Sequence, residues 1–252
     1  YQGIGNLTDA ATTASEKTRG QVLIHNEKIC DTRYSKSCGG ISENNENVWF
    51  DEPKPYLRAI YDGNDTSIPN LKSESDLKKW FSENQNCFCG PKYLKENDLK
   101  KYLGNVDNSG SYFRWDVPYS QEEITKLISE KTGREFDSIQ SLQALNRGVS
   151  GRITQLRIDG ISSYEISHII LKSEYEIRRV LHSNFLFSSA FIIEANSTAD
   201  SLPSRFIFKG AGWGHGVGLC QIGALGMALN GISFTEILSH YFQSTELRKI
   251  YS

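Results

Sequence analysis

The spacing of hydrophobic side chains predicts an amphipathic helix near the middle of the chain. Ser120-Gln-Glu-Glu123 is a capping box, in which the serine and the last glutamate satisfy free backbone amides at a helix start. Ile124, Leu127 and Ile128 then recur at helical spacing, and Thr132-Gly133 ends the pattern. We therefore predict a helix between these two signals.

Shorter hydrophobic runs elsewhere alternate between strand-like and helix-like periods. Residues 151–158 alternate with period 2, which predicts a half-buried strand that Gly160 closes. Other predicted strands are 21–25, 28–34, 56–61, 112–118, 168–172, 185–193 and 204–209, with 139–147 as loop or strand. Other predicted helices are 9–20, 73–84, 93–102, 173–181, 221–229 and 233–240. This mixture predicts an α+β fold, with a mixed, largely antiparallel sheet and several short helices around a central substrate cleft.

We predict one domain over residues 1–252, with an inserted subregion over 63–118, because no repeat or linker is visible. The chain begins at Tyr1-Gln-Gly-Ile-Gly-Asn without Met or the features of a signal peptide, so we expect it to be N-terminally incomplete. No run of about 18 apolar residues occurs, so no membrane span is expected. The net charge of −2 gives no basic field, which excludes nucleic acid as a partner.

Glycine is concentrated between Gly210 and Gly226. Seven of these 17 residues are glycine, whereas the average over the chain, 21 glycines in 252 residues, predicts about 1.4. The glycines alternate over 210–218, which we call the glycine ladder. An extended ladder would have one face without side chains, where backbone groups can approach a ligand closely. The other face would carry Trp213, which can stack on a sugar or peptide, and His215.

His215 is the titratable side chain of the ladder, with an ordinary pKa near 6.5. A satisfied core histidine is the alternative, but in this setting we favour a functional role. Gln221 follows where a helix begins, and a helix N-terminus favours an acceptor or anion. A phosphate loop is not supported, because no Lys-Ser/Thr follows. A nucleophilic pair of Cys220 and His215 is disfavoured, because residues of opposite parity in a strand face opposite sides.

The five cysteines, Cys30, Cys38, Cys87, Cys89 and Cys220, leave at least one thiol unpaired in a monomer. Cys87-Phe-Cys89 is shorter than the usual C-x-x-C zinc knuckle, so we do not favour a zinc site built wholly from these cysteines. A disulfide from Cys38 to Cys87 or Cys89 and buried free thiols both stay open. The small, polar segment 35–40 ends in Gly-Gly, so we expect a loop whose backbone approaches something closely.

The run Gly212-Trp-Gly-His-Gly-Val-Gly-Leu-Cys-Gln-Ile-Gly-Ala224 resembles the signature of the stage II sporulation protein D family (SpoIID/LytB domain), in which Gly-x-Gly-His-Gly-Val-Gly-x-x-Gln-x-Gly-Ala recurs. Arg114-Trp115 and Cys220 look most like members from Bacteroidetes-type bacteria. The resemblance extends over nearly the whole chain and rests on further segments, in order Ala14–Leu23, Tyr34–Gly40 with Glu43, Ser150–Ile153 and Ile237–Tyr241.

Members of this family are lytic transglycosylases that cleave the β-1,4 bond after N-acetylmuramic acid (MurNAc), before N-acetylglucosamine (GlcNAc), in peptide-stripped peptidoglycan strands and leave 1,6-anhydroMurNAc ends. The resemblance implies the same reaction here. One carboxyl group suffices, because it protonates the leaving oxygen and then takes the proton of the sugar's 6-hydroxyl. Glycoside hydrolysis uses two carboxylates instead.

The resemblance and the ladder together predict the site residues. The predicted catalytic-site residues are His215, Gln221, Tyr34, Ser35 and Ser37. The predicted substrate-binding residues are Gly39, Gly40, Glu43, Thr18, Trp213, Gly214, Gly216 and Gly218. The ladder is expected to form one wall of the cleft, and 34–40 the opposing wall.

The chain departs from the family in its catalytic acid, because the family's catalytic glutamate lies upstream of the region that matches Tyr1-Gln2-Gly3. A His/Cys metal-binding segment of some members also lies upstream, so zinc is expected only there and no metal ligand is predicted within this chain. Glu43, Glu46 and Asp51 lie near the matched loops. We interpret Glu43 as a solvated loop residue in preference to the acid.

Two further functions remain as alternatives. One is a glycan-binding module of the cell wall without activity, and the other is a hydrolase that releases reducing ends. The expected partners are peptidoglycan glycan strands and an amidase that acts on the same wall. The expected location is extracytoplasmic, in the periplasm or cell envelope, after export. The sequence does not fix the oligomeric state.

Overall fold

The computed structural model describes residues 8–65, 67–83, 86–103, 111–196 and 202–251, which pack around two hydrophobic cores. Apolar side chains from the terminal parts of the chain form the first core, and side chains from 115–208 form the second. Helices and largely antiparallel sheets are both present, which confirms the predicted α+β class. The subregion at 63–118 stays a prediction, and Tyr1-Gln2-Gly3 lie outside the described residues.

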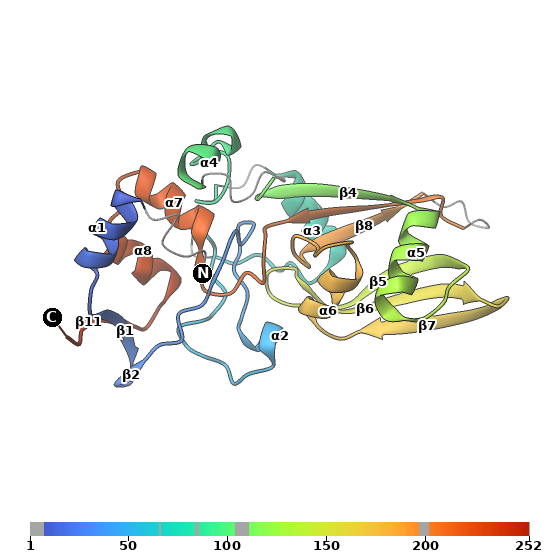
Figure 1. The fold of residues 1–252 in the computed structure, drawn as a ribbon, viewed down its shortest axis with the longest axis horizontal. Coiled ribbons are helices and arrows are strands. Elements are labelled where there is room, and N and C mark those ends of the chain that lie inside the picture. The colour runs from blue at the N-terminus through green and yellow to red at the C-terminus, as the bar shows by residue number, and fades with distance from the viewer. Residues whose placement is uncertain (1–7, 66, 84–85, 104–110, 197–201, 252) are drawn as a thin grey trace.

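The part around the first core, which we call the loop half, consists of short elements joined by long loops. In chain order they are α1 (Asp9–Lys17), β1 (Gln21–His25), β2 (Lys28–Ile29), β3 (Tyr34–Ser35), α2 (Glu46–Trp49), α3 (Glu74–Ser82), α4 (Glu96–Leu103), β10 (Leu219–Cys220), α7 (Gln221–Leu229), α8 (Phe234–Tyr241) and β11 (Glu246–Lys249). Strands β11, β1 and β2 form an antiparallel sheet, and β10 pairs in parallel with β3. In Figure 1, elements from both terminal parts of the chain lie in this half, where β11 pairs with β1.

The part around the second core, which we call the sheet half, consists of longer regular elements. They are β4 (Arg114–Ser120), α5 (Gln121–Thr132), β5 (Ser138–Arg147), β6 (Ile153–Ser162), β7 (Glu165–Leu171), α6 (Glu174–Val180), β8 (Phe191–Ala195) and β9 (Arg205–Ala211). Two antiparallel sheets, β4-β9-β8 and β5-β6-β7, pack with α5 and α6 (Figure 1). Ile124 and Ile128 of α5 are fully buried in the second core.

Helix boundaries follow the capping signals of the sequence. The capping box at Ser120 and Glu123 starts α5, and Gly133 ends it in the left-handed conformation with φ +70°. Ser233 and Glu236 form a second capping box at the start of α8. These caps satisfy backbone amides that have no partner within the helix, which confirms the predicted helix starts. Among the described residues, no helix is long and apolar enough to cross a membrane.

The predicted strand at 56–61 is wrong. Backbone amides there are satisfied by loop side chains, since Ala59 N donates to Oδ1 of Asn44 and Ile60 N to Oγ of Ser42. A backbone with such partners has no need of a strand ladder. Other boundaries also differ: for example, β2 stops at Ile29, β8 begins only at Phe191, β7 begins already at Glu165, and β6 continues through Gly160.

Candidate functional site

After β9 ends at Ala211, the glycine ladder (residues 210–218) packs against the loop at 33–39 and is not an extended strand. The glycines at even positions from 212 to 218 have φ between +73° and +101°, the left-handed region that favours glycine. A Cβ on Gly218 would lie 2.1 Å from the carbonyl oxygen of Arg33. The prediction that a side-chain-free face of the ladder contacts a ligand is therefore wrong. The backbone that approaches the glycines belongs to the protein's own loop.

Backbone hydrogen bonds join the ladder and the loop into one wall. Ser37 N donates to Trp213 O at 3.0 Å, and Trp213 N donates to Ser37 O at 2.7 Å. Farther along, Tyr34 of β3 lies opposite Leu219 of β10. The loop therefore does not form an opposing wall across a cleft, because it is hydrogen-bonded directly to the ladder. Its Gly-Gly backbone does make the predicted close approach, which is to the ladder, where a Cβ on Gly39 would lie 2.8 Å from Gly212 N.

Glu43 lies in a buried hydrogen-bond network. Its side chain is wholly buried, so its interpretation as a solvated loop residue is wrong. Ser150 donates through its hydroxyl at 2.6 Å, and the other donors are the backbone amides of Asn44, Val149 and Ser150 and the side-chain amide of Asn47. A buried carboxylate is stable only when such donors replace its hydration. Glu43 therefore fixes the segment that follows the loop to the turn that precedes β6.

Arg152 continues this network to the ladder. Its side chain is 1% exposed, and Nη1 donates to the hydroxyl of Ser150 at 2.9 Å. Nη2 donates to the carbonyl oxygens of Gly214 and Cys38, each at 3.3 Å. A Cβ on Gly216 would lie 2.3 Å from Cζ of this arginine. Ser150-Gly-Arg152 lies in one of the segments that resemble the family. The sequence of this segment does not indicate that Ser150 and Arg152 link Glu43 to the ladder.

His215 lies within this wall with its ring edge against Trp49, at a centroid distance of 4.8 Å. Nδ1 accepts a hydrogen bond from Val217 N at 3.1 Å. Burial and the neighbouring cations, foremost Arg152, lower the pKa of His215 to about 4. The imidazole is therefore neutral at pH 7 and is not a proton donor of the imidazolium type.

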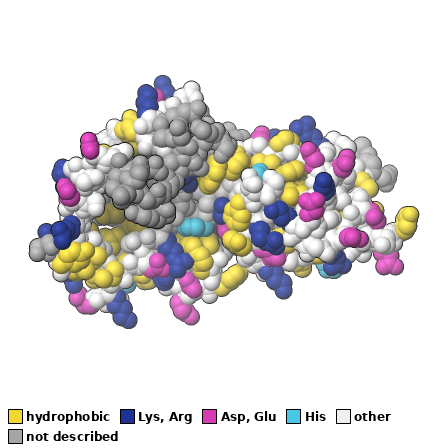
Figure 2. Space-filling model, in the orientation of Figure 1, with side chains coloured by type: hydrophobic (Ala, Val, Ile, Leu, Met, Phe, Trp, Pro, Cys, Tyr) yellow, Lys and Arg dark blue, Asp and Glu magenta, His cyan; other side chains and the backbone are white. Residues whose placement is uncertain are grey.

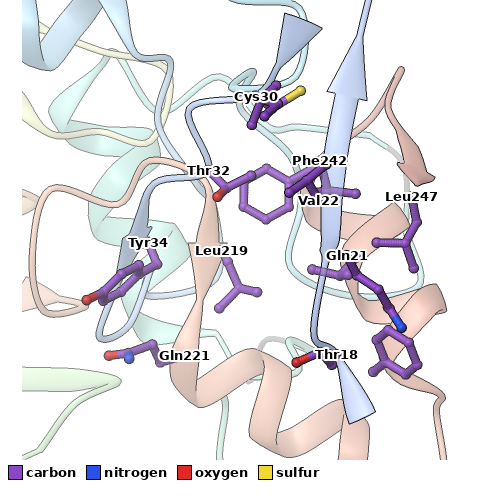
Figure 3. Close-up of a pocket in the computed structure, with 14 residues that line it drawn as sticks. Thr18, Gln21, Val22, Cys30, Thr32, Tyr34, Leu219, Gln221, Phe242 and Leu247 are labelled. Atoms are coloured by element: carbon purple, nitrogen blue, oxygen red, sulfur yellow. The ribbon is translucent and has the colours of Figure 1, made fainter. Parts of the chain in front are cut away.

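A cavity of about 450 Å³ lies between β1, β3, β10 and α8, next to this wall. Among the predicted site residues, Thr18, Tyr34 and Gln221 line it. Figure 3 shows Tyr34 and Gln221 on one side of this cavity and Gln21 and Phe242 on the other. Figure 2 shows a hollow with hydrophobic side chains on this part of the surface, while charges of both signs are scattered over the face. The cavity combines an apolar lining with a few polar groups, as small-ligand sites do.

The remaining predicted site residues lie inside the wall. Ser35 and Ser37 are buried, and their hydroxyls have no hydrogen-bond partner among the described residues. Gly40, like Gly39, has positive φ. Trp213 is half-buried between Phe187 and Tyr112, with ring centroids 4.5 and 5.1 Å away. The predicted site thus separates into three cavity residues and a supporting wall.

All five cysteines are free and buried, and three of them meet. Sγ of Cys38 lies 3.7 Å from that of Cys89, and Sγ of Cys220 accepts from Cys38 N at 3.2 Å. Burial raises the pKa of Cys38 and Cys89 well above the ordinary range. Burial acts the same way on Cys220, but hydrogen bonds from Cys38 and Cys89 outweigh it and lower its pKa to about 6. Cys220 thus belongs to this cluster, which does not support the pairing with His215.

The site consists of a glycine ladder that is hydrogen-bonded to a serine- and cysteine-containing loop, next to an apolar cavity. Together with the fold, this arrangement defines the class of protein. The chain belongs to the family described as "Domain of unknown function (DUF8618)", whose model matches residues 43–218. Its similarity to relatives named amidase enhancer and stage II sporulation protein D confirms the predicted resemblance to the stage II sporulation protein D family.

Three relatives carry this assignment. "Amidase enhancer" of Bacillus subtilis (strain 168) is 27% identical over 93% of this chain and 32% of its own length. "Stage II sporulation protein D" of Bacillus amyloliquefaciens is 25% identical over 94% of this chain and 50% of its own length. The protein of the same name in B. subtilis is 22% identical with the same coverage. The chain therefore spans about a third to a half of the length of these relatives.

Proposed function

We propose that this chain is the substrate-holding part of a peptidoglycan lytic transglycosylase that cleaves the MurNAc–GlcNAc β-1,4 bond of peptide-stripped glycan strands and leaves 1,6-anhydroMurNAc ends. The observation that carries the proposal is the convergence of Thr18, Tyr34 and Gln221 on one cavity. They come from three segments that each resemble the family, and Gln221 is far in the sequence from the other two. The names of the relatives, amidase enhancer and stage II sporulation protein D, support a role at the cell wall.

The cavity offers the two kinds of contact that a sugar ring requires. Apolar side chains such as Leu238 and Phe242 can cover the apolar face of a ring. The phenol of Tyr34 and the amide of Gln221 can exchange hydrogen bonds with its hydroxyls. Tyr34 is 61% exposed, and Gln221 at the start of α7 is exposed as well, so both side chains are accessible from solvent.

The proton donor of the proposed reaction lies elsewhere. None of the described residues that line the cavity is acidic. Of the carboxylates near the loop, Glu43 is buried, Glu46 pairs with Arg58 at 2.8 Å, and Asp51 lies 3.7 Å from Arg33. We therefore expect the acid, and the zinc ion that some family members hold through a His/Cys segment, in the region that the family places upstream.

The lack of an acidic lining residue favours one second candidate, a glycan-binding module without activity. The two are separated by incubating the longer protein that contains this chain with peptide-free glycan strands, followed by mass spectrometry. Anhydro products have no added water, and they support the transglycosylase. Products that carry one added water indicate the hydrolase, and retained binding without any product indicates the binding module.

The proposed substrate sets the proposed location and partners. Peptidoglycan lies outside the cytoplasmic membrane, so the proposal requires export to the periplasm or cell envelope. A relative named amidase enhancer suggests an amidase acting on the same wall as a partner. Co-purification of that amidase with the secreted protein would test this part separately.

A further inference from the structure

Three thiols and one carboxylate meet in the loop half, outside the cavity and the Glu43 network. The ligand atoms of Cys38, Asp62, Cys89 and Cys220 all lie within 4.8 Å of one another, and all four residues are buried. Sγ of Cys38 lies 3.7 Å from Sγ of Cys89 and 3.2 Å from Oδ2 of Asp62. Two sulfurs bound to one tetrahedral zinc ion lie about 3.8 Å apart, because each Zn–S bond is about 2.3 Å long. The spacing is therefore that of a metal's ligand shell.

Backbone amides point at two of these sulfurs. Cys38 N and Gly223 N donate to Sγ of Cys220 at 3.2 and 3.3 Å, and Gly40 N donates to Sγ of Cys38 at 3.4 Å. Cys220 is also the N-cap of α7, where the helix dipole favours a negatively charged side chain. Such donors stabilise thiolates, which are the form of cysteine that binds metals.

Two buried nitrogen groups near the cluster have no hydrogen-bond partner among the described residues. Nη1 of Arg114 donates to Gly39 O at 2.9 Å, but its Nε and Nη2 are unpaired, and the guanidinium interacts electrostatically with Cys89, Cys87 and Cys38. Nε2 of His240 is also unpaired and lies 3.7 Å from Oδ1 of Asp62. Buried polar groups seldom go unpaired, and a negatively charged centre at the cluster would give the Arg114 guanidinium an electrostatic partner.

We propose that Cys38, Cys89, Cys220 and Oδ2 of Asp62 bind one zinc ion in a closed tetrahedral site. Binding forms three Zn–S bonds and one Zn–O bond and releases the thiol protons to solvent. Three soft sulfurs with one carboxylate oxygen suit zinc, and four protein ligands make the site structural. Oδ1 of Asp62 accepts a hydrogen bond from the hydroxyl of Tyr241 at 2.6 Å, which orients the carboxylate. The site does not depend on the proposed function.

The ion would join three segments of the loop half. Cys38 belongs to the loop and Cys220 follows the ladder, while Asp62 and Cys89 come from the long connection that precedes β4. Cys220 is the neighbour of Gln221, and Cys38 lies four residues after Tyr34. Zinc would therefore hold in place the two backbone segments that present these side chains to the cavity.

The test compares the zinc content of two variants of the longer protein, Cys89→Ser and Cys87→Ser. Both cysteines are buried in the same segment, but Sγ of Cys87 is directed to Gly40 O at 3.7 Å and is not in the cluster. We expect Cys89→Ser to bind one zinc ion fewer per chain than Cys87→Ser. Zinc bound elsewhere in the protein is present in both variants and cancels in this difference. Equal zinc contents in the two folded variants would overturn the proposal.

A second measurement on the unmodified protein covers the case in which Cys89→Ser does not fold. Thiol alkylation is mapped by mass spectrometry before and after treatment with a zinc chelator. We expect the chelator to increase alkylation of Cys38, Cys89 and Cys220 at least several-fold and to leave Cys30 unchanged. No change at the three clustered thiols, or a disulfide-linked peptide that joins Cys38 to Cys89, would contradict the site.

Discussion

The sheet half is held by regular strand pairing, whereas the loop half is held by buried polar side chains. In the sheet half, β5 and β6 pair over most of their ten-residue lengths, and α5 covers an apolar core. In the loop half, the strands are two to five residues long. Glu43 and the cysteine cluster there, together with Arg152 at the edge of the sheet half, connect segments more than 60 residues apart.

This difference bears on the proposed function, which uses the loop half. Short strands supply few ladder hydrogen bonds, so the position of the loop and the ladder depends on a small number of buried polar contacts. Such contacts fix a backbone in one arrangement even where φ values are unfavourable for most residues. The residues that the sequence marks as a signature are mainly the ones that build this support, and only a few face the cavity.

The largest expected effect comes from Glu43→Gln. The amide group of glutamine would face backbone donors at Val149 and Ser150, so we expect a loss of about 4 kcal/mol in the free energy of unfolding. Denaturant titration measures it. Glu46→Gln is the control, because its pair with Arg58 is partly exposed and contributes about 0.5 kcal/mol. Equal losses in the two variants would mean that the Glu43 network does not hold the loop half.

Gly216→Ala is expected to cost about 3 kcal/mol, and Gly133→Ala only about 1 kcal/mol. Both glycines have positive φ, +79° and +70°. The new methyl group would meet the guanidinium of Arg152 at position 216 but open space at position 133. Thermal or chemical unfolding of the two variants measures the two losses in unfolding free energy, and their difference is the packing contribution at Gly216. Equal losses would contradict the view that the ladder glycines are needed because other groups approach them closely.

Protonation of His215 is expected to destabilise the fold as the pH falls. Its pKa is about 4 in the folded state and near 6.5 when unfolded, so the unfolded state binds more protons between these values. The stabilisation is complete above pH 6.5 and declines by up to about 3 kcal/mol as the pH falls to 4. Comparing the unfolding free energies of the native protein and His215→Gln across this range tests it. A difference that stays constant with pH would contradict the lowered pKa.

The smallest expected effect concerns helix starts in the two halves. Ser120→Ala in α5 and Ser233→Ala in α8 each remove a hydroxyl that caps a helix, so each is expected to cost about 1 kcal/mol. Both caps are exposed and local, so their cost is expected to be the same in either half. Urea titration of the two variants checks this, and a much larger loss in α8 would show that the loop half depends on local capping as well.

The sheet half and the capped helices could be predicted because their signals are local. Ser120 and Gly133 mark the ends of α5 by themselves, and alternation marks β6. The loop half depends on contacts that no local pattern contains, such as Ser150 with Glu43 or Cys38 with Cys220.

The glycine ladder shows the same limit. Its composition indicated close backbone approach correctly, but not that the partner is the protein's own loop. The cysteines were hardest to interpret, because ligands drawn from three segments have no common spacing. Convergence of Tyr34 and Gln221 on one cavity could be expected only through the family resemblance.

The central claim, that the cavity presents Gln221 to a glycan strand, is tested most directly by turnover of peptide-free strands. Gln221→Ala in the longer protein is compared with Gln143→Ala, an exposed glutamine on β5 in the sheet half. We predict at least a tenfold loss of anhydro products for Gln221→Ala, about 1.4 kcal/mol of transition-state stabilisation, with an unchanged melting temperature. Gln143→Ala should match the native rate. Equal rates for both variants would contradict the assignment of this cavity.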